Sequence, residues 1–395
     1  MAKSKKVNAG SKLTVSLRSI VKHFEAMPDP RHQRNRRHLL VDVITIAVCG
    51  VIVGCDGPTA ITIWAKAKQD WLKGLLELPN DIPSRDCVRR VLSTLKPEAF
   101  QQCFESWIAG LVSEITREST ELKRLIAMDG KTMRRSHDAK NGLGPLHLVS
   151  AWATENGLTL GQVATDAKSN EITVIPELIE RIDVKGALVT IDAMGCQKDI
   201  AKKIVDAKGD YVLAVKDNQP KLHEAIKEFF SDERQAELSK MPHRQHETSE
   251  QSHGRKDQRY YVLAKMPENF PLQDQWSGLK AIGMAVRVAE NPDGTTCGDV
   301  RYFISSCYLS GKRFAEAVRN HWRIENSLHW VLDVTFGEDQ SRTRNRRMAD
   351  NLAWLRRFAV SLLKRHPAKE SIRGKCRMAG WNNQFLMEVL MAQGV

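Results

Sequence analysis

Residues 187–215, with the sequence ALVTIDAMGCQKDIAKKIVDAKGDYVLAV, contain two short apolar runs separated by a helical pattern. The runs at 187–191 and 211–215 are continuous rather than alternating, which is typical of strands buried on both faces of a sheet. Residues 198–207 have the apolar spacing of a helix. A strand, a helix and a second strand in this order form a βαβ unit, which indicates an α/β fold.

Three more strands are expected upstream of this unit. An apolar run occupies 123–128, and strand-like segments at 146–154 and 158–166 flank the turn sequence Glu-Asn-Gly at 155–157. This turn sequence is typical of a hairpin. A helical pattern follows at 171–182. A hairpin meander followed by βαβ units predicts a mixed sheet flanked by helices.

The changes of pattern along the chain predict its domain organisation. Residues 1–15 are rich in Lys, Ser and Gly and are expected to form a disordered basic tail. The segment 16–115 has helical spacing with prolines near helix starts, so we expect an all-helical N-terminal domain. We place the α/β catalytic core at 120–340, with a β-rich insertion at about 221–305, and a basic helical segment at 341–395.

The second half of the chain holds further strands and helices. In the expected insertion, a charged helix and a polar linker rich in His and Gln precede strand-like pieces at 259–264, 279–290 and 300–305. A long helix is expected from 311 to 332 and an amphipathic one at 348–366. The last 25 residues have the composition of a loosely helical tail.

Composition points to a polyanionic partner. The net charge is +13; residues 1–40 carry ten Lys or Arg against two acids, and residues 341–377 carry twelve against two. Such basic ends favour binding to nucleic acid or to a membrane surface, although two solvated faces with no partner are the alternative. The apolar run at 39–54 includes Asp42 and is too short to span a bilayer, so we expect a buried helix and no membrane.

The eight cysteines and the absence of a signal-peptide pattern indicate the cellular compartment that we expect for the protein. No two cysteines form a CxxC pair, so a zinc knuckle is not expected. Reduced thiols in a cytoplasmic protein explain them best. The stretch 142–145 lacks the Lys-Ser/Thr of a phosphate-binding loop, which argues against a nucleotide cofactor.

Two aspartates follow apolar strands. Asp129 comes after the run 123–128 and Asp192 after the run 187–191, each with a glycine close behind. Carboxyl ends of strands are where ligands gather in such sheets. A helix cap or a turn is the alternative role for either aspartate.

A third carboxylate lies on the predicted helix at 311–332. On a helical wheel Glu325 falls within the apolar stripe of Phe314, Val318, Leu328 and Leu332. We therefore expect a buried carboxylate, which needs a partner: a Lys or Arg, a proton or a metal.

The alternative for Glu325 is a salt bridge to a core lysine, either Lys131 or Lys216. Three carboxylates from two strand ends and a helix instead suit two Mg²⁺ ions, for which Mn²⁺ could substitute. Two such ions can activate the attacking oxygen and stabilise the leaving oxygen in phosphodiester chemistry.

Four motifs carry a resemblance to a known family. Asp129-Gly130-Lys131, the sequence IDAMG at 191–195, the sequence HWRIENSLHW at 321–330 and the sequence DVTFGED at 333–339 resemble the acidic motifs of bacterial insertion-sequence transposases. The ISAs type, which includes the H-repeat-associated proteins, is the closest match within these DDE transposases. The resemblance extends over roughly 16–345, because the N-terminal part also resembles the domain that precedes the catalytic core in this family.

The resemblance implies an RNase H-like core in which Asp129 bridges two metal ions while Asp192 and Glu325 each hold one. It implies cleavage at insertion-sequence ends, followed by attack of the released 3′-hydroxyl on target DNA. The implied partners are double-stranded DNA, as terminal inverted repeats and as target, and a second copy of the chain, at the bacterial nucleoid. The pattern departs from the family where His321 replaces an Arg and Leu332 replaces a Lys.

Basic and aromatic residues near these motifs are candidate DNA contacts. We expect phosphate contacts from Lys131, His329, Arg323, Arg342, Arg344, Arg346 and Arg347. Trp322 and Trp330 could stack on an unpaired base, although Trp322, at the edge of the apolar stripe, is expected in the core. The alternative functions are a stand-alone RNase H-type nuclease and a DNA-binding relic without catalysis.

Overall fold

The computed structural model describes residues 23–25, 27–118, 124–165, 171–231, 234, 239–252 and 254–391. Nine strands form one mixed sheet in the order β3-β2-β1-β4-β5-β9-β8-β7-β6. The β1–β4 and β4–β5 pairs are parallel, and every other pair is antiparallel. The first five strands are β1 (Leu125–Met133), β2 (Leu146–Ala153), β3 (Leu158–Thr165), β4 (Leu188–Ile191) and β5 (Asp210–Val215). The mixed α/β sheet predicted from the sequence is confirmed.

Helices cover both faces of the central strands. Alternate side chains of β4 point to opposite faces: Leu188 packs in the cluster of Phe314 from α11 (Gly311–Ile324), and Val189 packs in the cluster of Ile200 from α8 (Lys198–Asp206). Helix α7 (Glu171–Arg181) lies beside α8. Burial on both faces explains why these strands have continuous apolar sequences.

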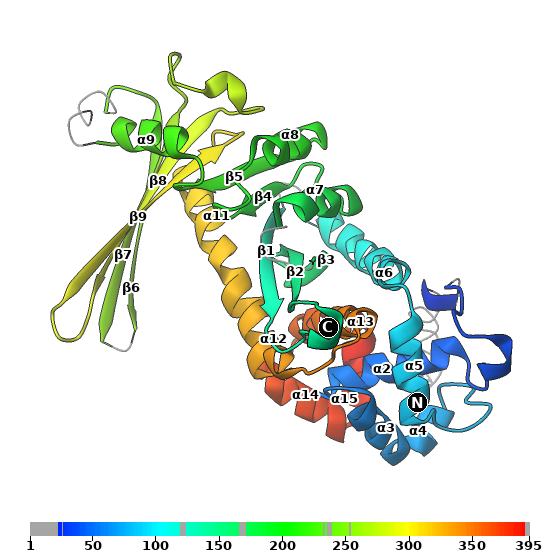
Figure 1. The fold of residues 1–395 in the computed structure, drawn as a ribbon. Coiled ribbons are helices and arrows are strands. Elements are labelled where there is room, and N and C mark those ends of the chain that lie inside the picture. Colours follow the sequence, from blue (N-terminus) through cyan, green and yellow to red (C-terminus); the bar gives the residue numbers. More distant parts are fainter. Residues whose placement is uncertain are drawn as a thin grey trace, which may run out of the picture.

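The expected insertion continues the same sheet instead of folding apart from it. Its strands are β6 (His243–Ser252), β7 (Arg255–Lys265), β8 (Ala281–Glu290) and β9 (Thr296–Ser305), preceded by α9 (Pro220–Phe229). Strand β9 pairs with β5, and the long hairpins project away from the rest of the molecule (Figure 1). The expectation of a polar linker before residue 259 is wrong. Strand β6 forms there, as a polar strand at the edge of the sheet.

The N-terminal region is helical, as predicted. It contains α2 (Leu40–Ile52), α3 (Pro58–Ala67), α4 (Gln69–Lys73), α5 (Arg85–Thr94) and α6 (Pro97–Glu118), with a short 3₁₀ turn at Gln33–Asn35. Helix α2 is buried along its length, which confirms the interpretation of the apolar run. Among the described residues, no helix is long and apolar enough to cross a membrane. The expected tail at 1–15 lies outside the described residues.

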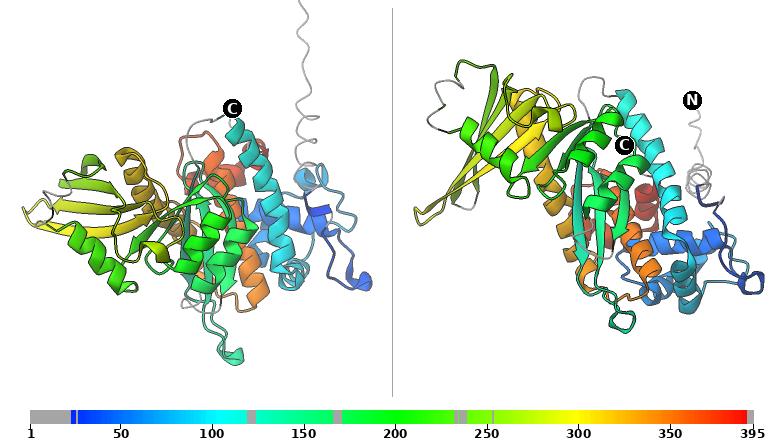
Figure 2. Two further views of the ribbon diagram at one scale, coloured as in Figure 1. Left: turned by 90° about the horizontal axis from the view of Figure 1, so that it is seen from above. Right: turned by 45° about the horizontal axis from the view of Figure 1, so that its top comes forward.

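Helix α13 (Arg346–Arg365) lies between the N-terminal helices and the sheet (Figures 1 and 2). It contacts α2, α5, α6 and β3, and its side chains from Met348 to Leu363 are buried. Part of the C-terminal basic cluster is therefore internal. The expectation of a loosely helical tail is wrong, since α14 (Ile372–Trp381) and α15 (Asn383–Met391) are regular helices whose apolar faces join the main core.

Asp350 on α13 gives a prediction for the pH dependence of stability. Its Oδ1 accepts hydrogen bonds from Gln162 Nε2 at 2.6 Å and Gln101 Nε2 at 3.3 Å, and burial raises the pKa of the carboxyl to about 6. A carboxyl whose pKa is raised on folding loses stability as pH rises from its unfolded pKa to its folded pKa. We expect Asp350→Asn, which keeps the acceptor oxygen, to raise the unfolding free energy by about 1–2 kcal/mol above pH 7.

Urea unfolding at several pH values tests this expectation. The gain should shrink as pH falls toward and below about 4, because below the unfolded pKa of Asp the Asp350 carboxyl becomes protonated in both the folded and the unfolded protein. A gain of the same size at both ends of the range would show that ionisation of Asp350 is not its cause.

Candidate active site

The two strand-associated aspartates lie on neighbouring parallel strands. Met128 of β1 pairs with Ile191 of β4, so Asp129 and Asp192 occupy adjacent positions at one edge of the sheet. Asp129 does not end its strand as expected: it pairs with Ser150 of β2, and β1 continues to Met133 because β2 still accompanies it. Asp192 follows the last residue of β4, as expected.

Asp192 is half-buried and has a structural role at the end of β4. Its Oδ1 accepts hydrogen bonds from the backbone N–H groups of Met194 at 3.1 Å and Gly195 at 3.3 Å. These contacts order the turn that leads into α8. The turn role that the sequence left open for Asp192 therefore exists, and it involves one of the two carboxylate oxygens.

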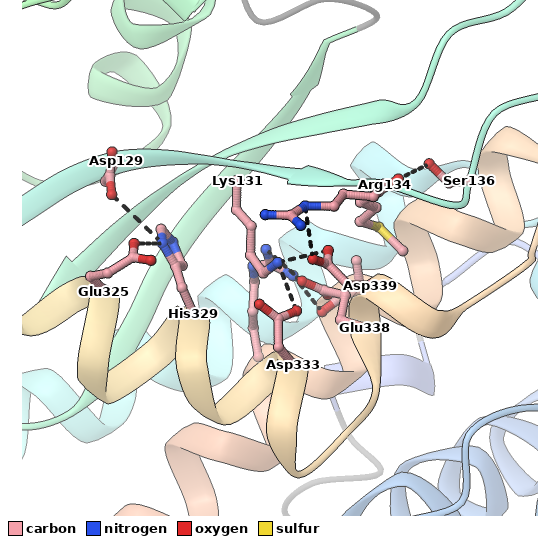
Figure 3. Close-up of polar contacts among 12 residues, drawn as sticks. Asp129, Lys131, Arg134, Ser136, Glu325, His329, Asp333, Glu338 and Asp339 are labelled. Carbon is pink, nitrogen blue, oxygen red and sulfur yellow. Dashed lines mark hydrogen bonds and ion pairs between the residues drawn. The ribbon is translucent and has the colours of Figure 1, made fainter.

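Glu325 begins a π-helical turn. Helix α11, the π turn Glu325–His329 and helix α12 (Trp330–Val334) form one continuous helical run. The π turn inserts an extra residue per turn, a feature that often marks functional sites. Figure 3 shows Glu325 and His329 on the side of this helix that faces Asp129 on β1.

His329 joins the two carboxylates. Its Nδ1 lies 2.8 Å from Glu325 Oε2 and 3.6 Å from Asp129 Oδ2 (Figure 3). The Glu325 side chain is 60% exposed, so the expectation of a buried carboxylate is wrong. The helical wheel gives the direction of the side chain but not its depth, because Glu325 lies beyond the part of α11 whose Phe314 and Val318 are covered by the sheet.

The charges of the site act on one another. Burial raises the pKa of the Asp129 carboxyl, and the nearby His329 and His321 oppose this effect only in part. The hydrogen bond from His329 lowers the pKa of Glu325. Burial also lowers the pKa of His321, which interacts with Asp129 and Asp192 and lies 3.3 Å from Thr190 Oγ1 through Nδ1.

His321 is therefore a member of the site that the sequence prediction did not assign. The available signal was its position, since His321 lies four residues before Glu325 and faces the same way on a helix. The prediction treated it only as a departure from a family pattern.

Gly130, next to Asp129, packs against two buried polar side chains, His147 and Glu171. A Cβ at this position would clash with Glu171 Oε1 and His147 Nε2. His147 Nε2 lies 2.5 Å from Glu171 Oε1, with both side chains buried, and His147 Nδ1 lies 2.8 Å from Thr132 Oγ1. This packing accounts for the glycine after Asp129 and fixes the backbone of β1 at the site.

Lys131 reaches a different pair of carboxylates. Its Nζ lies 2.8 Å from Asp333 Oδ1 and 3.0 Å from Asp339 Oδ1, and Arg134 also contacts Asp339 (Figure 3). The salt bridge to Glu325 that was left open for Lys131 is thus not formed. These contacts tie the segment after α12 to the strand that carries Asp129.

The tryptophans of the third motif are both exposed. Trp322 is 51% exposed and Trp330 is 58% exposed, so the expected core position of Trp322 is wrong. The Arg301 guanidinium of β9 lies 4.3 Å from the Trp322 ring centroid. Arg301 and Trp322 line a cavity of about 90 Å³ beside Asp192, together with Lys216 and His321.

The expected DNA-contacting arginines are spread over the surface near the site. Arg323 is exposed on α11. Arg342 and Arg344 line one groove, and Arg346 and Arg347 line another with Lys96. Arg346 Nη2 also donates to the carbonyl oxygen of Gly144. The structure does not gather these residues into a single cluster.

The donor set is compatible with a divalent metal ion. One ligand atom each from Asp129, Glu325 and His329 lie within 4.8 Å of one another. Carboxylate oxygens suit Mg²⁺ and Mn²⁺, whereas an imidazole is a less usual ligand for Mg²⁺. Asp192, on the adjacent strand, is the neighbouring carboxylate that could complete an all-oxygen set.

Comparison with known proteins identifies the family of this chain. Residues 120–363 match the family described as "Transposase DDE domain", and residues 21–108 match the family described as "DDE_Tnp_1-associated". The chain belongs to the DDE transposases. The expected RNase H-like α/β core preceded by a helical region is thereby confirmed.

Individual relatives narrow this assignment to the H-repeat-associated type. The chain is 37% identical to "H repeat-associated putative transposase YhhI" of Escherichia coli K12 over 96% of this chain and 100% of that protein. It is 40% identical to "Putative transposase YncI" of E. coli O157:H7 over 95% of each chain. It is also 30% identical to "Inactive transposase YbfQ" of E. coli K12, over 20% of this chain and 94% of that protein.

Proposed function

We propose that this protein is a catalytically competent DNA transposase that cleaves DNA at the ends of an insertion sequence and joins those ends to target DNA. The observation that carries the proposal is the meeting of Asp129 on β1 with Glu325 on the π turn, beside Asp192 on β4. These carboxylates come from separate parts of the chain, 196 residues apart at the extremes. A structural role alone would not require Glu325 to approach Asp129 beside a further carboxylate, Asp192, on the adjacent strand.

Asp129, Asp192 and Glu325 are the residues that would hold Mg²⁺ or Mn²⁺ in this proposal. Bound divalent ions would supply an activated oxygen nucleophile and stabilise the leaving oxygen. Asp129 would hold metal together with Glu325, whose partner His329 lies 3.6 Å from it, and with Asp192 of the adjacent strand. The backbone of Asp129 pairs with Ser150 of β2 and directly follows Met128, which pairs with Ile191 of β4, so the strand holds the carboxylate in place before substrate binds.

His329 and His321 lie next to these acids, and we expect them to orient the carboxylates. His329 positions Glu325 through the 2.8 Å contact, and His321 lies between Thr190 and the two aspartates. The exposed Arg323, Arg342, Arg344 and Arg347 would contact DNA phosphates in a salt-sensitive way that does not depend on sequence. A second copy of the chain would be needed to handle two element ends together.

The test is cleavage and joining of duplex DNA that carries the terminal repeats flanking this coding sequence. With Mg²⁺ we expect a 3′-hydroxyl at the element end and joined products with a target plasmid, and with EDTA we expect neither. Cleavage without any joined product would identify a stand-alone nuclease. Binding without cleavage in either Mg²⁺ or Mn²⁺ would identify a DNA-binding relic and contradict the proposal.

A further inference from the structure

A groove separates the N-terminal helices from the segment that follows α12. Its volume is about 720 Å³, and its walls are the start of α3, the outer side of α5 and residues 337–348. Four arginines line it: Arg89, Arg342, Arg344 and Arg356. Its lining contains one acid, Asp56, and no aromatic residue. The groove is thus strongly basic and offers no surface on which a base could stack.

The first turn of α3 borders this groove. Gly57 is the N-cap and Pro58 the first helical residue, and no side chain caps the helix. Gly57, Pro58 and Thr59 all line the groove. The first N–H groups of a helix have no intrahelical acceptor, and together with the helix dipole they favour an anion.

Arg356 provides a second, independent feature that calls for an anion. Its side chain lines the groove but is only 2% exposed. Nη2 donates to the backbone carbonyl of Asp56 at 3.2 Å, whereas Nη1 has no hydrogen-bond partner among the described residues. The buried carboxylate of Glu338, whose charge acts on Arg356, is paired with Arg357. A buried cation without a contacting counter-ion is costly, and an anion in the groove would offset that cost.

We propose that this groove is a seat for one backbone phosphate of DNA, held by the first turn of α3 above Arg356. The inference rests on the proposed function for the nature of the anion. The exposed Arg342 and Arg344 continue the basic surface away from the seat, as an extended polyanion requires and a free phosphate does not. The lack of aromatic residues argues against a nucleotide.

The seat has a fixed position relative to the candidate active site. The wall formed by residues 337–348 is held to β1 through Asp339 and Lys131, and to α13 through Glu338 and Arg357. Strand β1 also carries Asp129. A phosphate in the seat would therefore set the register of the duplex with respect to the acids, a positioning contact that carries no sequence information.

Gly57→Asp tests the seat by filling it. A Cβ at Gly57 meets nothing within 4 Å, and an aspartate at an N-cap accepts hydrogen bonds from the N–H groups that the phosphate would use. We expect the Tm to equal or exceed that of the parent, while affinity for a short duplex in EDTA falls roughly tenfold or more. The slope of log K against log salt should decrease by about 0.9.

Gly298→Asp is the matched control, because it adds the same charge at an exposed, uncrowded glycine of β9. It should change duplex affinity by less than about twofold. Arg356→Gln should weaken duplex binding in the same way as Gly57→Asp, provided that its circular dichroism spectrum matches the parent. Sulfate should raise the Tm of the parent by more than it raises that of Gly57→Asp, because in the variant the aspartate already occupies the seat.

Parent-like duplex affinity and salt slope in Gly57→Asp would overturn the proposal. If sulfate still protected only the parent in that case, the groove would be a site for free anions and not for DNA. Because these measurements are made in EDTA, they do not depend on cleavage. A protein that binds the duplex through the seat but never cleaves would contradict the proposed function and leave the seat standing.

Discussion

Asp129→Asn is expected to lower metal-dependent DNA cleavage by at least about three orders of magnitude. The substitution keeps the shape of the side chain but removes the negative charge of Asp129, one of the three candidate metal ligands. Asp129 lies 3.6 Å from His329 and beside Asp192, so its charge is central to the site. Since burial raises the pKa of this carboxyl, the neutral amide should not destabilise the fold.

The companion variants Asp192→Asn and Glu325→Gln should cause losses of similar size. Glu316→Gln is the matched control, because Glu316 is a partly exposed carboxylate of the same helix that contacts Arg313. Its cleavage rate should stay within about twofold of the parent. All four proteins should bind duplex DNA equally in EDTA, which separates a loss of chemistry from a loss of binding.

Full activity in Glu325→Gln would remove Glu325 from the site. Asp333 and Asp339 would then be the remaining candidates on that part of the chain. The structure argues against them in advance, because both carboxylates contact Lys131 and lie apart from Asp129 (Figure 3).

The sequence predicted the central sheet well, because its strands are buried on both faces. Such burial leaves apolar runs at 187–191 and 211–215 that no exposed loop would retain. Strand β6 escaped prediction for the opposite reason. It is an edge strand with almost no buried side chain, and its order comes from backbone pairing with β7, which leaves no hydrophobic pattern.

The sequence indicated which acids lie near one another but not what surrounds them. A helical wheel assumes 100° per residue and an evenly covered helix, so it could not show the π turn or the exposure of Glu325 and Trp322. The contacts of Lys131 with Asp333 and Asp339 also depend on how the chain turns after α12. Pairings between residues distant in sequence are set by tertiary packing, which periodicity alone does not describe.

Arg357→Met is expected to lower the unfolding free energy by about 3–5 kcal/mol. Arg357 Nη1 lies 2.7 Å from Glu338 Oε1, and neither side chain is exposed to solvent. Arg357 also donates to Ser150 Oγ at 3.0 Å, so it joins the segment after α12 to the sheet. Removing the guanidinium leaves the Glu338 carboxylate buried without its charged partner.

The pH dependence of this loss has a definite sign. Arg357 holds the pKa of Glu338 below its usual value, so in the parent the pair contributes stability above the unfolded pKa of Glu and loses it as pH falls. Without Arg357, burial should raise that pKa against the remaining charges of Arg356 and Lys131, and protonation then relieves the buried charge. Urea unfolding should therefore show the largest defect at neutral pH and a smaller one near pH 4 to 5, about the usual pKa of Glu.

A double variant, Glu338→Leu with Arg357→Met, separates the lost pair from general damage to the core. Replacing both partners with apolar groups removes the uncompensated charge, so we expect it to recover most of the stability that Arg357→Met loses. An equally large loss in the double variant would mean that the hydrogen bond to Ser150, or shape alone, carries the effect.

The same variants connect stability to the site. Glu338 is adjacent in sequence to Asp339, whose contact with Lys131 ties this segment to the strand that carries Asp129. The double variant should restore the fold without restoring the charged anchor of the segment. We therefore expect it to regain stability but to cleave DNA more slowly than the parent, whereas parent-like cleavage would show that Lys131 and Asp339 hold the segment without help from Glu338.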